Sequence, residues 1–591
     1  MQQGALLCHA FSASGFAGSL PGALRTFGAD EDGAGHRSIT HYWSRMRTLL
    51  TVMFFLAFAS SGAPCHAQST PVRYDLHVKV IPDAHLLEVS GTMVLPSSAA
   101  SRASVQLSFS ELMTDFTLQV VRPVGSAGDA RLEKKEVDSG EATWNVYPRN
   151  PFPSGEEIEL RFTYSGGKKL AFLFYVGPEV SFASAYGTNW YPIVVDGFDK
   201  GVGSLKITVP AGETAVAAGD RRSSAEQEAQ GTFLFDINRS TYFSFASGKF
   251  TTVRRAGSIP VSVHLLSERP DMQQYLERVV QLLNVLEKEF GPYRFKDFAL
   301  VEIPRDLAKK AGMNAATLQG FAYVNSNAFN VPPSTFNVLV GWYGHEFSHS
   351  WWPHILSMKR PRGWAIEESL AEYGGLRAVE TIVGPELAEE YRRKGYPPDP
   401  IYSALEYFKL VGAGIDYQLG DLPRSIEGHN IAYNKGFLVW NMLSLEIGRE
   451  KFQRILRDLT SRYAFQQLTL AEFWRQIEIG AGRNLGWFFK QWFERLGAPE
   501  FHLEWKQSGR KVVGAITQVS PYYRATTEVE VVGAEKQRVV FKLKVNGART
   551  PFTLPVKFRV ESVTLDPHYQ VLRWTPEYHA AAEAARKARN K

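Results

Sequence analysis

The sequence predicts a multidomain α+β protein. Short segments of alternating apolar and polar residues, separated by Gly, Pro, Ser and Asn, dominate the N-terminal part and return near the C-terminus, whereas helical periodicity dominates much of the stretch between them. At 591 residues the chain also exceeds one ordinary hydrophobic core. We expect an upstream segment with a signal peptide at 1–67, an N-terminal β-rich domain at 68–255, an α/β domain at 256–500, a small C-terminal β-sandwich at 501–576 and a tail at 577–591.

The composition excludes one large class of partner. Hydrophobic residues make up 44% of the chain, aromatic residues 13% and charged residues 21%, which supplies ample core material for a globular protein. The formal net charge of +6 is small for this length, and the sequence shows no basic stripe interleaved with aromatic residues. We therefore expect no nucleic-acid partner.

Residues 47–67 have the three-part form of a secretory signal. A basic residue is followed by an apolar run over 49–59 and then by small residues that end at Ala67. The run is too short for a stable transmembrane anchor. We expect cleavage near Ala67-Gln68 and an exported protein, periplasmic or secreted, with Met46 as its natural start. An uncleaved anchor or a buried helix is the alternative.

The β-rich domains are predicted from period-two patterns. Residues 74–80 and 204–209 alternate between apolar and polar side chains, as half-buried strands do. The same alternation at 538–545 indicates a sandwich strand near the C-terminus.

The central domain begins with a different pattern. Apolar residues at helical spacing predict a helix over 272–290, which Gly291-Pro292 ends. The apolar run 298–304 predicts a buried strand, and 321–324 is expected to form an edge strand.

His345, Glu346 and His349 form a metal-binding pattern on one predicted helix. Two histidines four positions apart project from the same face, so both imidazoles can reach one metal ion, and Glu346 is placed to take a proton from a water there. A catalytic zinc needs a third protein ligand and one open position. Glu368 follows His349 after 18 residues on a second predicted helix, and Glu367 competes with it for that place. The pattern predicts one zinc ion per chain.

This pattern resembles the gluzincin peptidases of the membrane alanyl aminopeptidase and leukotriene hydrolase family, which have His-Glu-x-x-His, an 18-residue interval and Glu. The resemblance implies a saddle-shaped N-terminal β domain and a thermolysin-like catalytic domain. It also implies that His345, His349 and Glu368 are zinc ligands and that Glu346 is the general base. The family's interval and its Glu-x-x-Ala-Glu-Tyr ending favour Glu368 over Glu367.

Two further residues take roles from the same resemblance. Glu372, one helical turn after Glu368, falls where a carboxylate orients a ligand histidine. Tyr433, in the sequence Tyr-Asn-Lys-Gly, falls where the family has a tyrosine whose hydroxyl hydrogen-bonds the oxyanion. We expect Tyr433 to act beside Glu346 in catalysis.

The chain differs from the family in the residues that would bind the amino terminus of the substrate. Family aminopeptidases carry Gly-x-Met-Glu-Asn, whose Glu binds the free ammonium, but here no Glu occurs between Glu302 and Glu346. Counted back from the metal helix, Gln319 and Gly320 replace Glu and Asn. Counted forward from the preceding strand, Asn314 marks the remnant. Both registers lack the anionic anchor, unless an acid elsewhere, such as Glu302, replaces it.

These residues predict an exported zinc-dependent metallopeptidase that resembles aminopeptidases but lacks their amine anchor. Its partner would be a peptide that adds as a strand along 321–324. Cleavage at chain ends and cleavage of internal bonds both stay open. So do two other functions: a zinc hydrolase of a non-peptide substrate, and an inactive peptide-binding relative.

Overall fold

The computed structural model describes residues 70–590 except 102, 139, 196–199 and 397–401. The expected signal at 47–67, its cleavage position at Ala67-Gln68 and the expected start at Met46 lie outside the described residues. Within the described part, none of the helices combines the length and the hydropathy needed to cross a bilayer.

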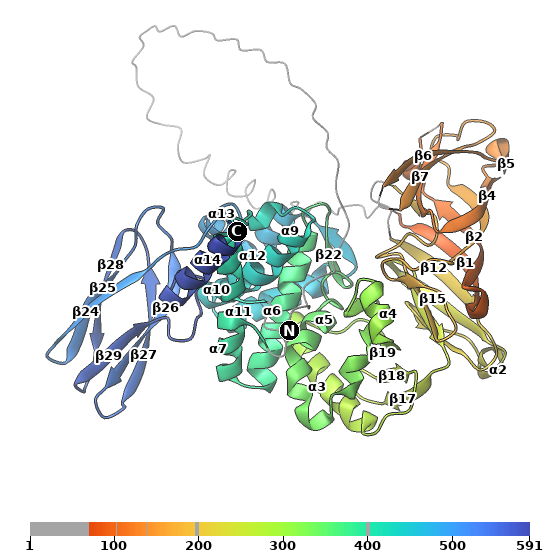
Figure 1. Cartoon of the computed structure of the whole chain (residues 1–591). Helices are drawn as coiled ribbons and strands as arrows, with labels where there is room; N and C mark the ends of the chain where they lie inside the picture. The colour runs from red at the N-terminus through yellow and green to blue at the C-terminus, as the bar shows by residue number, and fades with distance from the viewer. Residues whose placement is uncertain (1–69, 102, 139, 196–199, 397–401, 591) are drawn as a thin grey trace, which may run out of the picture. The chain divides into compact units, whose positions relative to one another are not determined.

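The N-terminal region is rich in β-structure (Figure 1). Side chains of β1 (Val72–Ile81) alternate between buried and exposed, as the sequence pattern predicts, because one face of the sheet packs on the core. β1 pairs antiparallel with β2 (Leu86–Leu95) and parallel with β12 (Gly201–Thr208). The largest sheet also contains β14 (Asp220–Arg221), β15 (Thr232–Thr241), β8 (Ile158–Gly166), β4 (Met113–Arg122) and β5 (Gly128–Asp129), in the order β14-β15-β12-β1-β2-β8-β4-β5.

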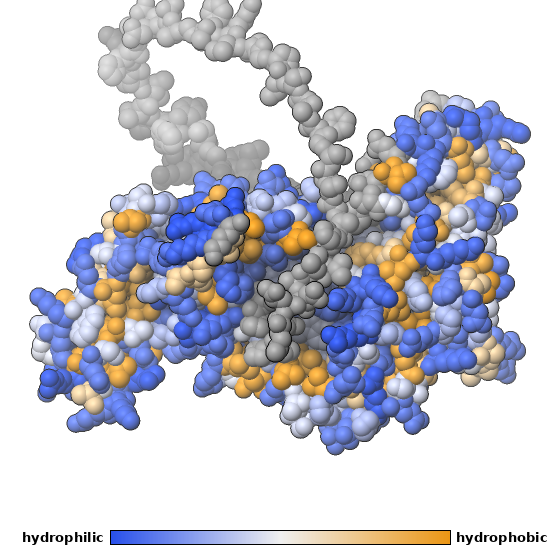
Figure 2. All heavy atoms as spheres, viewed as in Figure 1, coloured by the Kyte–Doolittle hydropathy of each residue, from blue (hydrophilic) through white to orange (hydrophobic). Residues whose placement is uncertain are grey.

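Two four-stranded sheets complete this region. One has the order β13-β16-β10-β9 and the other β11-β3-β7-β6. Their strands are β13 (Thr214–Ala217), β16 (Ser244–Gly248), β10 (Val180–Ser184), β9 (Phe174–Tyr175), β11 (Ile193–Val194), β3 (Val105–Ser110), β7 (Glu141–Tyr147) and β6 (Arg131–Asp138). On the face shown in Figure 2, hydrophilic residues cover much of the surface and hydrophobic residues lie in scattered groups.

The central region is built on a five-stranded sheet with the order β17-β18-β19-β21-β20. Its strands are β17 (Thr251–Arg255), β18 (Val261–Leu265), β19 (Phe298–Ile303), β21 (Phe321–Asn325) and β20 (Ala315–Leu318). β18, β19 and β21 run parallel, and β17 and β20 are antiparallel to their neighbours. The strand 251–255, assigned from the sequence to the N-terminal domain, pairs with β18 and so belongs to this sheet.

The expected edge strand is an interior strand. Residues 321–324 lie in β21, which pairs with β19 on one side and with β20 on the other. Gln319 and Gly320 form the turn that folds β20 back along β21, and Gly320 has φ +83°, a conformation that favours glycine. Because this turn supplies a second partner, residues 321–324 are buried, and the true edge is β20.

Helices cover one face of the sheet (Figure 1). The helix expected at 272–290 is α3 (Met272–Phe290), and its predicted apolar positions are buried. The others in this layer are α5 (Val340–Ser348), α6 (Trp364–Ile382), α7 (Pro385–Lys394), α8 (Ala404–Gly412), α9 (Ile426–Ile431), α10 (Phe437–Ile447), α11 (Arg449–Arg462), α12 (Leu470–Ala481) and α13 (Gly486–Trp492). The short helix α4 (Arg305–Lys310) packs through Ala308 in the cluster on the opposite face of the sheet.

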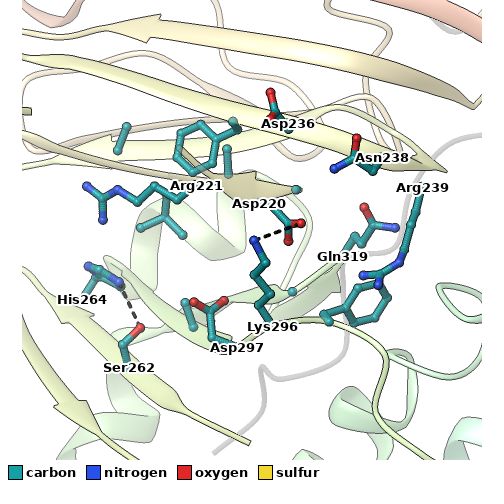
Figure 3. A pocket seen from close by; sticks show the side chains of 18 of the residues that line it. Asp220, Arg221, Asp236, Asn238, Arg239, Ser262, His264, Lys296, Asp297 and Gln319 are labelled. Carbon is teal, nitrogen blue, oxygen red and sulfur yellow. Dashed lines mark hydrogen bonds and ion pairs between the residues drawn. The ribbon is translucent and has the colours of Figure 1, made fainter. Parts of the chain in front are cut away.

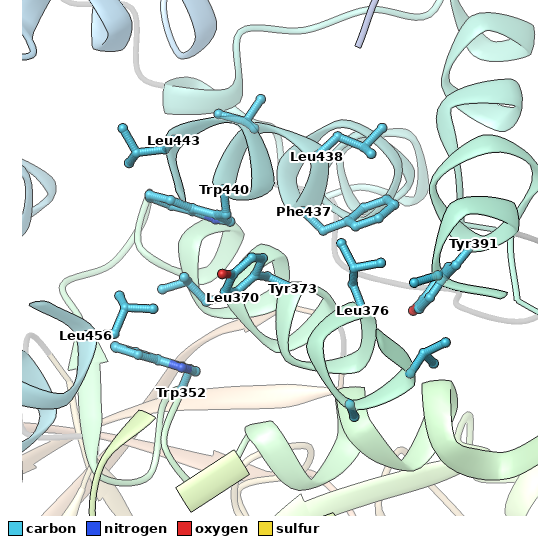
Figure 4. Close-up of a cluster of buried hydrophobic side chains, with 14 of the residues drawn as sticks. Trp352, Leu370, Tyr373, Leu376, Tyr391, Phe437, Leu438, Trp440, Leu443 and Leu456 are labelled. Atoms are coloured by element: carbon cyan, nitrogen blue, oxygen red, sulfur yellow. The ribbon is translucent and has the colours of Figure 1, made fainter. Parts of the chain in front are cut away.

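The helix α6 lies at the centre of this helical layer. Its side chains are buried over most of its circumference, and Figure 4 shows Leu370, Tyr373 and Leu376 of α6 facing Phe437 and Trp440 of α10. The indole of Trp440 also donates a hydrogen bond to the hydroxyl of Ser369 at 2.8 Å. Truncating such buried rings costs about 3–5 kcal/mol, so this packing holds α6 in a fixed position.

The C-terminal region contains two three-stranded sheets, which confirms its β-rich character. The sheets are β24 (His502–Ser508), β25 (Lys511–Thr517) and β28 (Arg549–Pro555), and β27 (Arg538–Val545), β26 (Ala525–Gly533) and β29 (Val560–Leu565). The strand expected at 538–545 coincides with β27.

The expected tail is a packed helix, α14 (Pro576–Arg589). Thr575 caps it by accepting a hydrogen bond from the backbone N–H of Tyr578, and proline at the first helical position favours the helix start. The ring of Tyr578 stacks on Phe408 of α8, with 4.9 Å between centroids. Alanine favours a helix in this segment, and the contact between Tyr578 and Phe408 supplies the packing partner that composition alone did not indicate.

Candidate zinc site

The site depends on a close approach of two helices. α5 carries His345 and Glu346, and His349 is the residue that caps its C-terminal end, while α6 carries Glu367, Glu368 and Glu372. Gly344 of α5 and Gly375 of α6 face each other, and a Cβ added at Gly344 would lie 2.9 Å from the Cα of Gly375. Glycine at both positions lets the backbones approach closely enough for side chains of both helices to converge.

The structure brings three of the expected metal ligands together. Nε2 of His345 lies 3.2 Å from Nε2 of His349, and Oε2 of Glu368 lies 3.7 Å and 3.4 Å from these two nitrogens. All three side chains are nearly buried, and in the described part of the chain theirs is the one group of three or more such side chains close enough to hold a metal ion. Two imidazoles and one carboxylate are a donor set that suits a catalytic zinc.

Glu367 points to other partners. Its carboxylate lies 2.9 Å from the guanidinium of Arg360 and accepts a hydrogen bond from the backbone N–H of Met358 at 2.7 Å. These partners satisfy a side chain that is only 2% exposed. The geometry therefore separates the two adjacent glutamates, and Glu368 is the one that meets the histidines.

Both histidines are oriented through their second ring nitrogen. Nδ1 of His345 lies 2.8 Å from Oε2 of Glu372, and Nδ1 of His349 donates to the carbonyl of Trp352 at 2.7 Å. The hydrogen bond holds the ring of His349, and the ion-pair contact with Glu372 lies on the far side of the His345 ring, so that each Nε2 faces Glu368. The hydroxyl of Tyr391, on α7, donates in turn to the carboxylate of Glu372.

We expect Tyr391→Phe to weaken zinc binding by about tenfold, because loss of this hydroxyl frees Glu372 and loosens His345. The ring would still pack on Phe437, 5.6 Å away, so the fold should persist. Chelator competition on the wild type and the variant measures the zinc affinity. Tyr396→Phe is the matched control, since that hydroxyl donates to the carbonyl of Asn337. Unchanged zinc affinity in Tyr391→Phe would show that Glu372 needs no support from α7.

Glu346 lies beside the three ligands on α5. Burial raises the pKa of its carboxyl above the usual value, the two ligand histidines oppose this, and Glu368 and Glu372 add to it. Within the described chain its carboxylate accepts no hydrogen bond from another side chain, so both oxygens are available to a water or a substrate.

Tyr433 also lies in the site. Its hydroxyl donates to Oε2 of Glu368 at 2.9 Å, and its ring lies 5.4 Å from that of His345. Burial, followed by the Glu368 carboxylate, raises the pKa of Tyr433 well above its usual value, so the hydroxyl remains a donor. It sits on a π-helical turn, Ala432–Gly436, between α9 and α10, and such turns are frequent at functional sites.

The sequence reasoning missed His354. Nε2 of this buried histidine donates to the carbonyl of Thr317 at 2.9 Å, which ties edge strand β20 to the segment just after α5. Burial lowers the pKa of His354 to about 3, so the ring is neutral at ordinary pH. A third histidine five positions after His349 was the available signal.

The expected substrate-binding residues lie apart from the three ligands. Gln319 and Gly320 occupy the turn after β20 and line a pocket that contains none of the metal-site residues. The carbonyl of Asn314 accepts a hydrogen bond from the backbone N–H of Asn325. In the described part of the chain, no hydrogen bond or ion pair joins these three residues to the ligands.

Ala315 and Thr317 are the side chains of β20 that face the helical layer, and Thr317 is the polar one of the two. Thr317 pairs with Ala322, whose side chain lies in the core shared with α3 and α5, whereas Leu318 packs in a different cluster. Its hydroxyl is buried without a hydrogen-bond partner. Glu302 does not supply the missing carboxylate beside Thr317, because its own carboxylate is ion-paired with Arg269 and accepts a hydrogen bond from the N–H of Leu266 at 2.8 Å.

Comparison with known proteins gives a family match for the central region. The peptidase family M1 domain matches residues 275–492, from within α3 to the end of α13. The chain is 22% identical to Probable aminopeptidase 1 of Sulfurisphaera tokodaii over 364 residues, 58% of this chain and 45% of that protein. It is 21% identical to Glutamyl aminopeptidase of Sus scrofa over 287 residues, 46% and 30% of the two chains. With Aminopeptidase N of Streptomyces lividans it shares 22% identity over 252 residues, 41% and 28%.

The chain thus spans less than half the length of these relatives. The matched segment contains α5, α6 and the turn that carries Tyr433, so the similarity includes every residue of the converged site. The spacing of those residues, their convergence and the match together identify residues 275–492 of this chain as a peptidase family M1 domain.

Proposed function

We propose that this protein is a zinc-dependent metallopeptidase that hydrolyses peptide bonds. The observation that carries the proposal is the convergence of His345, His349 and Glu368 with Glu346 beside them. A zinc ion held by these ligands would lower the pKa of water and polarise the scissile carbonyl.

Glu346 is the proton carrier in this proposal. One of its carboxylate oxygens accepts a proton from the attacking water and then delivers it to the nitrogen of the leaving amine. Burial raises the pKa of this carboxyl above its usual value, which makes it a better proton acceptor. Water and the peptide are thereby converted to a carboxylic acid and an amine without a covalent intermediate on the protein.

Tyr433 stabilises the oxygen of the scissile carbonyl. In the structure its hydroxyl donates to Glu368, and the same hydroxyl must exchange that acceptor for the substrate oxygen as negative charge develops. A protonated tyrosine that is buried beside the ligands is suited to this role, because it donates without carrying a charge of its own.

The substrate is proposed to lie along edge strand β20. A peptide can add as a further strand there, and the polar side chain of β20 that faces the helical layer is Thr317. A buried substrate ammonium needs a carboxylate partner, since a charge-assisted hydrogen bond is about twice as strong as a neutral one. Threonine cannot neutralise that charge, so we infer weak selectivity for free amino termini.

We expect matched peptides with free and acetylated amino termini to be cleaved at comparable rates, and Thr317→Glu to raise the preference for the free amine. Measurement of kcat/KM for both peptides tests this. Gln319→Glu is the control, because Gln319 lies in a separate pocket and should leave the preference unchanged. A wild-type preference for the free amine above about a hundredfold, roughly 2.7 kcal/mol, would contradict the inference.

We further propose that the protein is exported and begins near Gln68 in its mature form. The order of basic, apolar and small residues over 47–67 supports this. Intact-mass measurement of exported protein should give a chain that starts near Gln68. A mass that retains residues 47–67 would show that the segment is not cleaved.

A further inference from the structure

A polar pocket lies on the face of the central sheet opposite the zinc helix. Phe298 of β19 contacts Phe347 of α5, with 4.9 Å between ring centroids, whereas the next residue, Ala299, lines the pocket. Successive residues of a strand face opposite sides, so the pocket and the zinc site are on different faces. The opposite wall comes from β13, β14 and β15 of the N-terminal region. The cavity measures about 120 Å³.

The pocket holds an excess of positive charge. Its cationic side chains are Arg221, Arg239, Arg254 and Lys296, and its acidic side chains are Asp220, Asp236 and Asp297. Two of the acids are already paired, Asp220 with Lys296 at 3.2 Å and Asp236 with Arg222, which does not line the pocket, at 3.3 Å. Among the cations, Arg221 is paired with Glu228 outside the pocket at 2.6 Å, so in the described part of the chain Arg239 and Arg254 supply the unpaired positive charge.

Arg239 has no carboxylate partner among the described residues. Its guanidinium lies over the rings of Phe465 and Phe295, 4.9 Å and 5.7 Å from their centroids. These ring contacts stabilise the cation without using its N–H groups, which stay available to an acceptor.

Gln319 supplies a second donor without an acceptor. The side chain is only 4% exposed, and its amide Nε2 is buried with no hydrogen-bond partner. Buried donors in folded proteins are nearly always satisfied, so an orphaned amide that lines a cavity points to a missing acceptor. Figure 3 shows Gln319 and Arg239 at one end of the pocket, with Asn238 nearby and His264 at the other end.

We propose that this pocket binds a small oxyanion of the phosphate or carboxylate class. One oxygen would accept from the guanidinium of Arg239 and another from Nε2 of Gln319, a charge-assisted arrangement that satisfies both donors. A cavity of about 120 Å³ admits such an ion with several waters, since one water needs roughly 10–15 Å³.

The bound ion links two parts of the fold. Gln319 lies in the turn of the β20–β21 hairpin, and Arg239 lies on β15. An oxyanion shared by them fastens the turn that precedes β21 to the N-terminal sheet. The zinc-site residues take no part in this, so the inference stands independently of the proposed peptidase activity.

The test uses the full zinc-loaded chain, titrated calorimetrically with inorganic phosphate and separately with acetate at constant ionic strength set by chloride. We expect saturable binding of at least one of the two ions and a higher melting temperature at saturation. Tighter binding of phosphate assigns the phosphate class, and equal or tighter binding of acetate assigns the carboxylate class. Absence of saturable binding for both ions would overturn the proposal.

Two variants test whether the ion binds in this pocket. Arg239→Gln and Gln319→Glu should each weaken binding at least tenfold, the second because a carboxylate repels the anion in nearly the same volume. Arg161→Gln is the matched control: it removes the same charge from an exposed position on β8 that does not line the pocket, and it should bind as the wild type does. Binding that survives both Arg239→Gln and Gln319→Glu lies elsewhere, the zinc included, and contradicts the proposal. Should Arg239→Gln fail to fold, Gln319→Glu decides the matter alone.

Discussion

Glu346→Gln should abolish peptide hydrolysis while the protein still binds one zinc ion per chain. The amide cannot accept a proton from water, and loss of a general base typically costs about a hundredfold or more in rate. Zinc should stay bound, because the three ligands that converge are His345, His349 and Glu368. The measurement pairs kcat on a peptide substrate with the zinc content of the same preparation.

The control for this variant is Glu386→Gln, an exposed glutamate on α7 outside the site, which should keep the wild-type rate. If Glu346→Gln retained more than a few per cent of the wild-type rate, another group would have to carry the proton. If it lost its zinc, Glu346 would belong to the metal-binding set.

Glu368→Gln should lose zinc and activity together, whereas Glu367→Gln should keep zinc. The two residues are adjacent on α6, but only Glu368 meets the histidines, and Glu367 meets Arg360 and the N–H of Met358. Removing a direct ligand should weaken zinc binding by more than about a hundredfold, beyond the range for lost orienting partners. Chelator competition on both variants, with a melting curve for each, measures this.

This pair is informative because the change in chemistry is identical at neighbouring positions. Glutamine at 367 can still accept from the N–H of Met358, so the fold around Arg360 should persist. The reverse outcome, zinc lost from Glu367→Gln and kept by Glu368→Gln, would exchange the two assignments.

Much of the candidate site follows from local geometry in the sequence. Helical periodicity alone puts His345 and His349 on one face, and the interval to Glu368 proposes a third ligand. The choice between Glu368 and Glu367 needed the resemblance, because helix phase cannot separate two candidates without a known orientation of α6. In the structure, Glu367 is ion-paired with Arg360, and this contact distinguishes it from Glu368, which meets the histidines.

The edge of the sheet could not be predicted with the same success. A run such as 321–324 reads as a strand, but whether it lies at the edge depends on the two-residue turn at Gln319-Gly320 and on the pairing that it creates. That turn also carries Gln319 away from the metal and leaves Thr317 facing the helical layer. Long-range pairing, not local pattern, decides such positions.

The short C-terminal helix was missed for a related reason. A segment rich in Ala, Arg and Lys can be a solvated tail or a helix, and the helix is favoured here because Tyr578 finds Phe408 and Ala582 lies against Gly412. A Cβ at Gly412 would lie 2.1 Å from the carbonyl oxygen of Ala582, so α8 is shaped for this contact. Such complementarity appears only once both helices are placed.

The central claim is that zinc at His345, His349 and Glu368 lets this chain hydrolyse peptide bonds. The most direct measurement is turnover of an unbiased peptide library by the metal-free chain, by the chain reloaded with one zinc, and by zinc-loaded Glu346→Gln in parallel. We expect cleavage with the reloaded wild type alone. Equal cleavage by the metal-free chain, or no cleavage of any peptide by the zinc-loaded wild type, would contradict the claim, and the second result would favour a non-peptide substrate or a peptide-binding role.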